Sequence, residues 1–103
     1  YPLAADDAAA PAVTELKGNY PNPFNPSTTI VYSVKESTPV LIEIYNLKGQ
    51  LVRVLVDESK IAGKHEVVFD GLDDNRSPLA SGVYLYRMKA GAYVQSQKMI
   101  LLK

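Results

Sequence analysis

The feature of this sequence that most limits its fold is an alternation of apolar and polar residues, which begins near Ser27 and continues to the end. Successive residues of a β-strand point to opposite faces, so half-buried strands have a period of two, whereas helices repeat every 3.6 residues. No segment of the 103 residues keeps the helical period for three turns. We therefore expect an all-β domain.

The alternation separates into about seven predicted strands. In chain order they are a short irregular strand near Leu16 and strands over residues 28–34, 40–45, 50–56, 64–69, 83–90 and 93–102. In strand 50–56 the three valines are expected on one face and Arg53 on the other. The turn NLKG, Asn46–Gly49, signals a hairpin, because its Asn can cap the turn and its Gly can take positive φ. Strands spaced about 8–12 residues apart are typical of an antiparallel β-sandwich.

The first thirteen residues form a separate segment. Tyr1–Val13 contains six alanines, two prolines and two aspartates without a sustained period, which is the composition of a linker. We expect residues 1–13 to be a linker from an upstream passenger domain and residues 14–103 to be one domain with a single core. The sequence begins without a methionine or an apolar leader, so we expect a fragment of a longer protein.

A proline-rich stretch, YPNPFNP, comes directly before the first clear strand. Proline fixes φ and restricts the residue before it, which predicts a stiff segment close to polyproline II. Phe24, in the middle of this stretch, is expected to plug one end of the sandwich. The stretch then acts as a rigid corner that covers an open sheet edge. The other interpretation is a peptide-recognition motif with exposed proline faces.

The composition excludes several classes of function. Eleven basic residues balance eleven acidic ones, so no net charge is available to hold nucleic acid. With no cysteine and with His65 as the only histidine, we expect no disulfide, no zinc site and no activated nucleophile. Apolar runs such as Met99–Leu102 are far shorter than the roughly 20 residues that cross a bilayer. We therefore expect a domain that is not an enzyme, holds no cofactor and does not span a membrane.

One loop carries oxygen ligands of the kind that calcium prefers. Asp70, Asp73, Asp74 and Asn75 lie within six residues, although their spacing is not that of an EF-hand. Solvated turn residues are the other interpretation of the same cluster. The sequence thus predicts either an ordinary polar turn or a structural calcium site.

Tyrosines raise the question of carbohydrate binding, in which aromatic faces stack on sugar rings. Tyr84 and Tyr86 share one face of their predicted strand, and Tyr93 lies across the hairpin from them. A short exposed row could form a sugar-binding platform. Tyrosines at alternate strand positions more often pack into the sandwich, with the hydroxyl reaching water.

Five segments, in their order and spacing, resemble the C-terminal sorting domains of cargo proteins of the type IX secretion system. They are NYPNPFNPSTTIVYSV, IEIYNLKGQLVRVLV, AGKHEVVFDG, SGVYLYRMKAG and KMILLK. The resemblance covers about Leu16–Lys103. A related immunoglobulin-like module of flagellar hook-capping proteins has a similar sequence.

The resemblance implies an immunoglobulin-like antiparallel β-sandwich of about seven strands, with the sorting signal in the C-terminal hairpin. Matched position by position, the signal falls on Gly82, Tyr84, Lys98, Met99, Leu101 and Lys103. The implied partners are an outer-membrane translocon and a sortase-like peptidase. By the same resemblance, the passenger folds in the periplasm, crosses the outer membrane and is secreted or held at the cell surface. A cut by the peptidase would fall in residues 1–13.

The sequence departs from the family pattern at two positions. Phe69 stands where the family usually has tryptophan, and it preserves an aromatic plug with less buried area. Arg76 stands where the family has glycine, so we expect the turn not to need positive φ there, with Asn75 taking that conformation instead.

Two other functions stay open on the residues alone. One is a carbohydrate-binding or spacer module of a polysaccharide-degrading enzyme, supported by the linker and the tyrosines. The other is an assembly module like the hook-cap domain.

Overall fold

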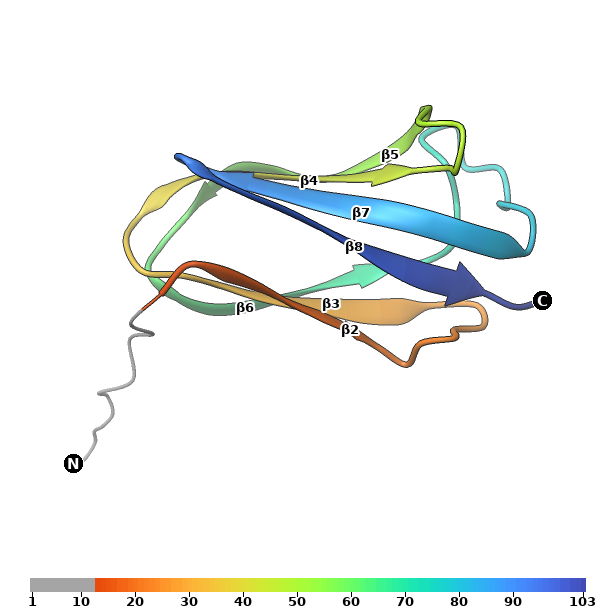
Figure 1. Ribbon diagram of the computed structural model, residues 1–103, viewed down its shortest axis with the longest axis horizontal. Helices are drawn as coiled ribbons and strands as arrows, with labels where there is room; N and C mark the ends of the chain where they lie inside the picture. Colours follow the sequence, from red (N-terminus) through yellow and green to blue (C-terminus); the bar gives the residue numbers. More distant parts are fainter. Residues whose placement is uncertain (1–12) are drawn as a thin grey trace.

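The structure, a computed structural model, describes residues 13–103, so the predicted linker lies outside the described residues except for Val13. Two antiparallel sheets face each other (Figure 1). The three-stranded sheet has the order β2-β3-β6, and the four-stranded sheet has the order β5-β4-β7-β8. The strands are β2 (Glu15–Tyr20), β3 (Thr28–Val34), β4 (Thr38–Tyr45), β5 (Leu51–Lys60), β6 (Gly63–Phe69), β7 (Gly82–Ala90) and β8 (Tyr93–Leu101). The expected all-β, immunoglobulin-like sandwich of seven strands is confirmed.

The core lies between the sheets and consists of the inward residues of the predicted rows. Ile30 and Tyr32 of β3 face Ile42 and Ile44 of β4, and all four side chains are at most 1% exposed. The other buried apolar residues are Leu16, Phe24, Val34, Val40, Val56, Phe69, Leu79, Tyr84, Tyr86, Met88, Ala90, Met99 and Leu101. Within residues 13–103 there is no helix long and apolar enough to cross a membrane.

The turn between β4 and β5 has the structure that the sequence predicts. The Asn46 Oδ1 accepts the N–H groups of Lys48 at 2.9 Å and Gln50 at 3.0 Å, and Gly49 has φ +82°, as predicted for this hairpin.

The prediction that the three valines of β5 share one face is wrong. Two register shifts against β4 leave Val52 and Leu55 without a direct partner. Each extra residue reverses which side chains point inward, because the side-chain period of a strand is two. Val52 and Leu55 therefore pack against the core, together with the buried Val56, while Val54 does not.

The proline-rich segment closes one end of the sandwich. Phe24 is 1% exposed, and its ring centroid lies 5.9 Å from that of Phe69, so the predicted plug is confirmed. The segment is not polyproline II, because the peptide bonds that precede Pro21, Pro23 and Pro26 are cis. The segment and the end of β8 lie at the same end of the molecule, opposite to the turn between β7 and β8 (Figure 1).

Candidate functional site

The last six residues, Lys98–Lys103, are called the tail here; two of them are buried and four are exposed. Met99 and Leu101 are 0% and 1% exposed and point into the core. Lys98 and Lys103 lie in solvent, as do Ile100 and Leu102, which are 38% and 53% exposed. The two buried residues anchor the strand, and the four exposed residues are accessible to another molecule.

The SGVY motif anchors the hairpin from the neighbouring strand. Gly82 pairs with Leu101, and its φ of +155° is one that residues with a side chain rarely adopt. Tyr84 pairs with Met99, is 7% exposed and donates its hydroxyl to the Ala80 carbonyl at 2.7 Å. Of the six predicted signal residues, the structure thus places Tyr84, Met99 and Leu101 inside.

Half-buried side chains of β7 join the exposed ones of β8 on the outer face of the sheet. Val83 pairs with Ile100, and Leu85 pairs with Lys98, so these four side chains point to the same side. Sequence reasoning did not select Val83, Leu85 or Ile100. The period of two in both strands was the signal that could have identified them.

The charges on this face are unequally neutralised. Arg87 contacts the Glu43 carboxylate at 3.2 Å and the Tyr45 hydroxyl at 2.8 Å. Neither Lys98 nor Lys103 has a carboxylate within 4.0 Å among residues 13–103. The exposed part of the tail therefore carries two lysine side chains that no acidic side chain within residues 13–103 neutralises, and they lie beside apolar side chains.

The tail is held in place by the proline-rich segment. Phe24 donates its N–H to the Ile100 carbonyl at 2.8 Å and accepts the Leu102 N–H at 3.0 Å. The Ile100 N–H donates to the Asn22 Oδ1 at 3.0 Å. These bonds satisfy the outward backbone groups of an edge strand, as a neighbouring strand would. Asn22 lies 78 residues from Ile100, so no local pattern in the sequence indicates this contact.

A side-chain seam joins the rest of β8 to β2. The Leu16 N–H donates to the Tyr93 hydroxyl at 2.9 Å, and the Gln97 amide donates to the Leu16 carbonyl at 2.8 Å. Both contacts lie next to the register shift between Leu16 and Gly18. The seam connects the two sheets through side chains, because β2 and β8 are not paired as strands.

The tyrosines considered for sugar binding are mostly inside the sandwich. Tyr86 is 0% exposed and donates its hydroxyl to the Asn19 Oδ1 at 2.9 Å. Burial raises the pKa of Tyr86 to about 12, so its hydroxyl stays a donor at neutral pH. Tyr84 is buried as well, and Tyr93 is half-buried with its hydroxyl engaged at Leu16. These three rings form no exposed row on which a sugar could stack.

The aspartates considered for calcium are each engaged by donors of the protein. The Asp70 Oδ1 accepts from the Arg53 guanidinium at 2.8 Å and from the Leu72 N–H at 3.1 Å. The Asp73 Oδ1 accepts two backbone N–H groups at 2.9 Å, and both oxygens of Asp74 face the Val54 N–H. Within residues 13–103 no three acidic, histidine or cysteine side chains are placed to share a metal ion. The carboxylates of this loop thus accept hydrogen bonds from donors of the protein itself.

The two departures from the family pattern have different outcomes. Phe69 is 0% exposed and packs on Phe24, so the aromatic plug is kept. The expectation for Arg76 is wrong: Arg76 itself has φ +67°, the only positive φ of a residue other than glycine in the described part of the chain. Its N–H donates to the Asp73 carbonyl at 3.0 Å, and this bond closes the turn that ends at Arg76.

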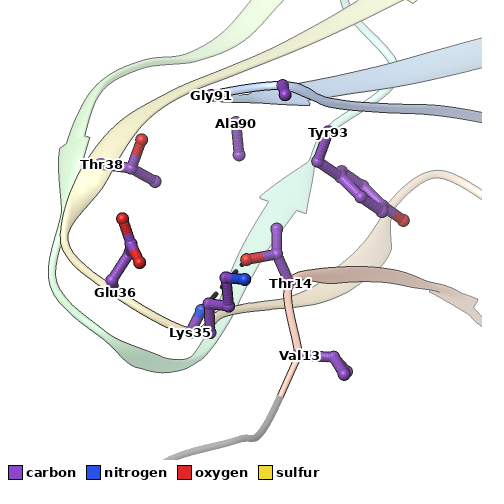
Figure 2. A pocket seen from close by; sticks show the side chains of 9 residues that line it. Val13, Thr14, Lys35, Glu36, Thr38, Ala90, Gly91 and Tyr93 are labelled. Carbon is purple, nitrogen blue, oxygen red and sulfur yellow. Dashed lines mark hydrogen bonds between the residues drawn. The ribbon is translucent and has the colours of Figure 1, made fainter.

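A hollow lies at the end of the sandwich opposite to the last residues of the chain. Its volume is about 380 Å³, and its lining comes from the start of β2, the β3–β4 connection and the turn of the last hairpin (Figure 2). The Lys35 N–H donates to the Thr14 hydroxyl there at 3.1 Å. This hollow adjoins Val13, where the described residues begin, and is remote from the tail.

A comparison with known protein families identifies the family of this chain. The family described as "Secretion system C-terminal sorting domain" matches residues 19–102. The chain belongs to this family. The resemblance to type IX sorting domains is thereby confirmed, and the sorting domain carries a role in secretion. Among curated proteins, none matches it.

Two solved structures from Porphyromonas gingivalis are similar to the sorting domain. Dimeric latent PorU has a TM-score of 0.72 and 24% identity, over 94% of this chain and 10% of that one. PorZ, an essential bacterial surface component of the type-IX secretion system, has a TM-score of 0.58 and 15% identity, over 82% of this chain and 11% of that one. At these identities the likeness shows the fold. The sorting domain spans about a tenth of the length of either protein.

Proposed function

We propose that this domain directs an attached protein across the outer membrane to the cell surface, and that the secretion machinery recognises the outer face of the last hairpin. The recognition face consists of Val83, Leu85, Lys98 and Ile100. One observation carries the proposal: the alternation that buries Met99 and Leu101 presents Lys98 and Ile100 on a rigid strand. A folded cargo can be selected only by a feature that stays accessible, and this face meets that requirement.

The domain itself is proposed to be non-catalytic. His65 stacks on Tyr32 with ring centroids 5.3 Å apart, and its Nε2 lies 2.8 Å from the Ile61 carbonyl. The ring thus has a structural partner on each side. This arrangement supports a binding role rather than acid–base chemistry.

The route and the partners complete the proposal. The export route is through the periplasm and the outer membrane, and the partners are the outer-membrane translocon, a sortase-like peptidase and the upstream passenger. Removal of the domain would occur in residues 1–13, outside the described residues. The carbohydrate-binding alternative is not favoured, since two of its three tyrosines are buried.

A reporter experiment tests this function. The full 103-residue chain is fused behind a signal peptide and a fluorescent protein, in a host with the type IX apparatus. We expect reporter at the cell surface with the unchanged chain and loss of delivery with Val83→Ser and Ile100→Ser combined. Leu47→Ser is the matched control, since Leu47 is 66% exposed in a distant turn.

Two results would count against the proposal. One is retention of the unchanged fusion in the periplasm. The other is normal delivery of the double variant. Thermal unfolding of each purified variant separates lost recognition from lost folding.

A further inference from the structure

We infer that the sorting domain has a second contact site, a groove between the proline-rich segment and the tail, which binds an extended, acidic segment of the secretion machinery. The inference rests on the proposed sorting function and identifies a surface separate from the outer face of the hairpin. Its occupant is a protein segment with apolar side chains and a carboxylate. The argument comes from the shape, the rigidity and the charge of the groove.

The groove lies where two distant parts of the sequence run side by side. Its volume is about 420 Å³, and its lining is Pro21, Pro23, Phe24, Asn25, Leu102 and Lys103. Phe24 and Leu101 pair in parallel, so one wall is the extended end of β8 and the other runs beside it at Phe24, with a bend on either side. A groove between two such walls fits another extended chain.

The walls are fixed before any partner arrives. Phe24 is buried against Phe69 and bonds the tail through both of its backbone groups. The Pro21 carbonyl accepts the Thr28 hydroxyl at 2.8 Å, and the Lys103 N–H donates to the Ser81 hydroxyl at 2.9 Å. A preformed site loses little conformational entropy on binding, which favours affinity.

The surface of the groove is apolar with one charged side chain. Pro21 and Pro23 are exposed and have no N–H to donate, and Leu102 is 53% exposed. Lys103 is the only charged residue of the lining, and it has no carboxylate within 4.0 Å among residues 13–103. An incoming carboxylate would therefore meet no competing acidic side chain in the lining.

The same features distinguish a protein segment from an anionic lipid surface. Binding to an anionic membrane surface depends on a cluster of several basic residues, each of which contributes about 1 kcal/mol. Here the lining holds one lysine, and the whole chain has a net charge of zero. Apolar walls with a single cation at one end favour a protein segment that supplies both kinds of contact.

Charge reversal in the reporter fusion tests the inference. We expect Lys103→Glu to lower surface delivery at least about tenfold, which corresponds to 1.4 kcal/mol of binding free energy. Lys103→Arg should stay within about twofold, since it keeps the charge. Lys48→Glu makes the same charge change in the exposed turn of another hairpin and should have no effect. Leu102→Ser tests the apolar wall and should also lower delivery.

The outcomes separate this inference from the proposed function. If the unchanged fusion is not delivered, both fail together. If Lys103→Glu and Leu102→Ser are delivered normally while the Val83 and Ile100 double variant is not, the groove inference is overturned and sorting by the hairpin face stands. Should Leu102→Ser unfold, Lys103→Glu alone decides.

A flotation assay tests the nature of the partner. The purified 103-residue chain is mixed with vesicles that contain anionic lipopolysaccharide. We expect no co-flotation. Co-flotation that Lys103→Glu abolishes would overturn the assignment to a protein partner.

Discussion

The two outer edges of the four-stranded sheet are closed in the same way but with opposite chemistry. At the β5 edge, the Val52 carbonyl accepts the Asp74 N–H at 2.9 Å, and the Val54 N–H faces the Asp74 carboxylate. At this edge and at the β8 edge, a loop replaces a neighbouring strand with backbone groups and one short polar side chain. This is a general way to protect an edge from pairing with another chain.

At the β8 edge the same roles are taken by Phe24, whose backbone bonds Ile100 and Leu102, and by the Asn22 side chain, which accepts the Ile100 N–H. The difference is what holds each cover in place. The cover of β5 is held by Arg53, which contacts Asp70 at 2.8 Å and Asp74 at 3.8 Å. The cover of β8 is held by a buried aromatic ring.

This difference determines which edge can serve a partner. In the polar cover the charge of Arg53 is paired with the carboxylates of Asp70 and Asp74. The apolar cover needs no charge, so the lysines of the tail stay unpaired by acidic side chains within residues 13–103. The β8 edge is thus closed against strand pairing and still carries free charge for recognition.

The largest expected effect is from removal of the apolar plug. Phe24→Ala should lower the free energy of unfolding by about 3–5 kcal/mol, because it leaves a cavity against Phe69 and releases the tail. Leu47→Ala, in an exposed turn, should change it by less than about 0.5 kcal/mol. Chemical denaturation measures both. A loss for Phe24→Ala as small as that of the control would show that the plug does not hold this edge.

A smaller effect is expected from removal of the polar cover. Arg53→Met keeps most of the side-chain volume over Phe69 but loses the ion pair, and it should cost about 1 kcal/mol. The Asp70 side chain is 42% exposed, so water can replace the guanidinium. The cost should shrink in 1 M salt, which screens exposed charges. A salt-independent loss as large as that of Phe24→Ala would contradict the contrast between the edges.

The pH dependence should also distinguish the two edges. Burial raises the pKa of Asp70, but the Leu72 N–H and the Arg53 guanidinium lower it by more, so it lies below the ordinary value. Such a carboxylate stabilises the fold above its unfolded pKa of about 3.9, and the contribution is lost as pH falls through the folded pKa.

Between about pH 5 and about pH 3, the wild-type chain should therefore lose more stability than Asp70→Asn. Urea unfolding at a series of pH values measures the difference. Phe24→Ala should keep the full loss on acidification, since its edge has no such carboxylate. Equal acid sensitivity of wild type and Asp70→Asn would refute the role of this pair.

The sequence predicts those parts of the fold that depend on local alternation. The inward rows of β3 and β6 and the buried halves of β7 and β8 follow from a period of two, and Phe24 was predicted as a plug because it interrupts a run of prolines. The bulges of β5 were not predictable, because they arise from its register with β4. The clamp of Asn22 on Ile100 depends on the whole topology.

The candidate site shows the same division. Exposure of Lys98 and burial of Met99 are local consequences of strand geometry. The groove is not, since its two walls lie about 80 residues apart in the sequence and meet only in the folded chain. The family resemblance identified the tail, and the structure was needed to find what lies beside it.

Arg76 gives the smallest expected effect and the finest test of the comparison, because it lies in the polar cover alone. Its left-handed backbone costs a residue with a side chain about 1–2 kcal/mol, and glycine removes that cost while losing about 0.5–1 kcal/mol of conformational entropy. Arg76→Gly should therefore stabilise the domain by up to about 1 kcal/mol, measured by denaturation. Asn75→Gly, one residue away, has no left-handed strain to relieve and should not stabilise. Our proposal places recognition at the β8 edge and none at the β5 edge, so Arg76→Gly should also leave delivery of the reporter unchanged. A loss of delivery would show that the β5 edge takes part in recognition and would contradict the proposal.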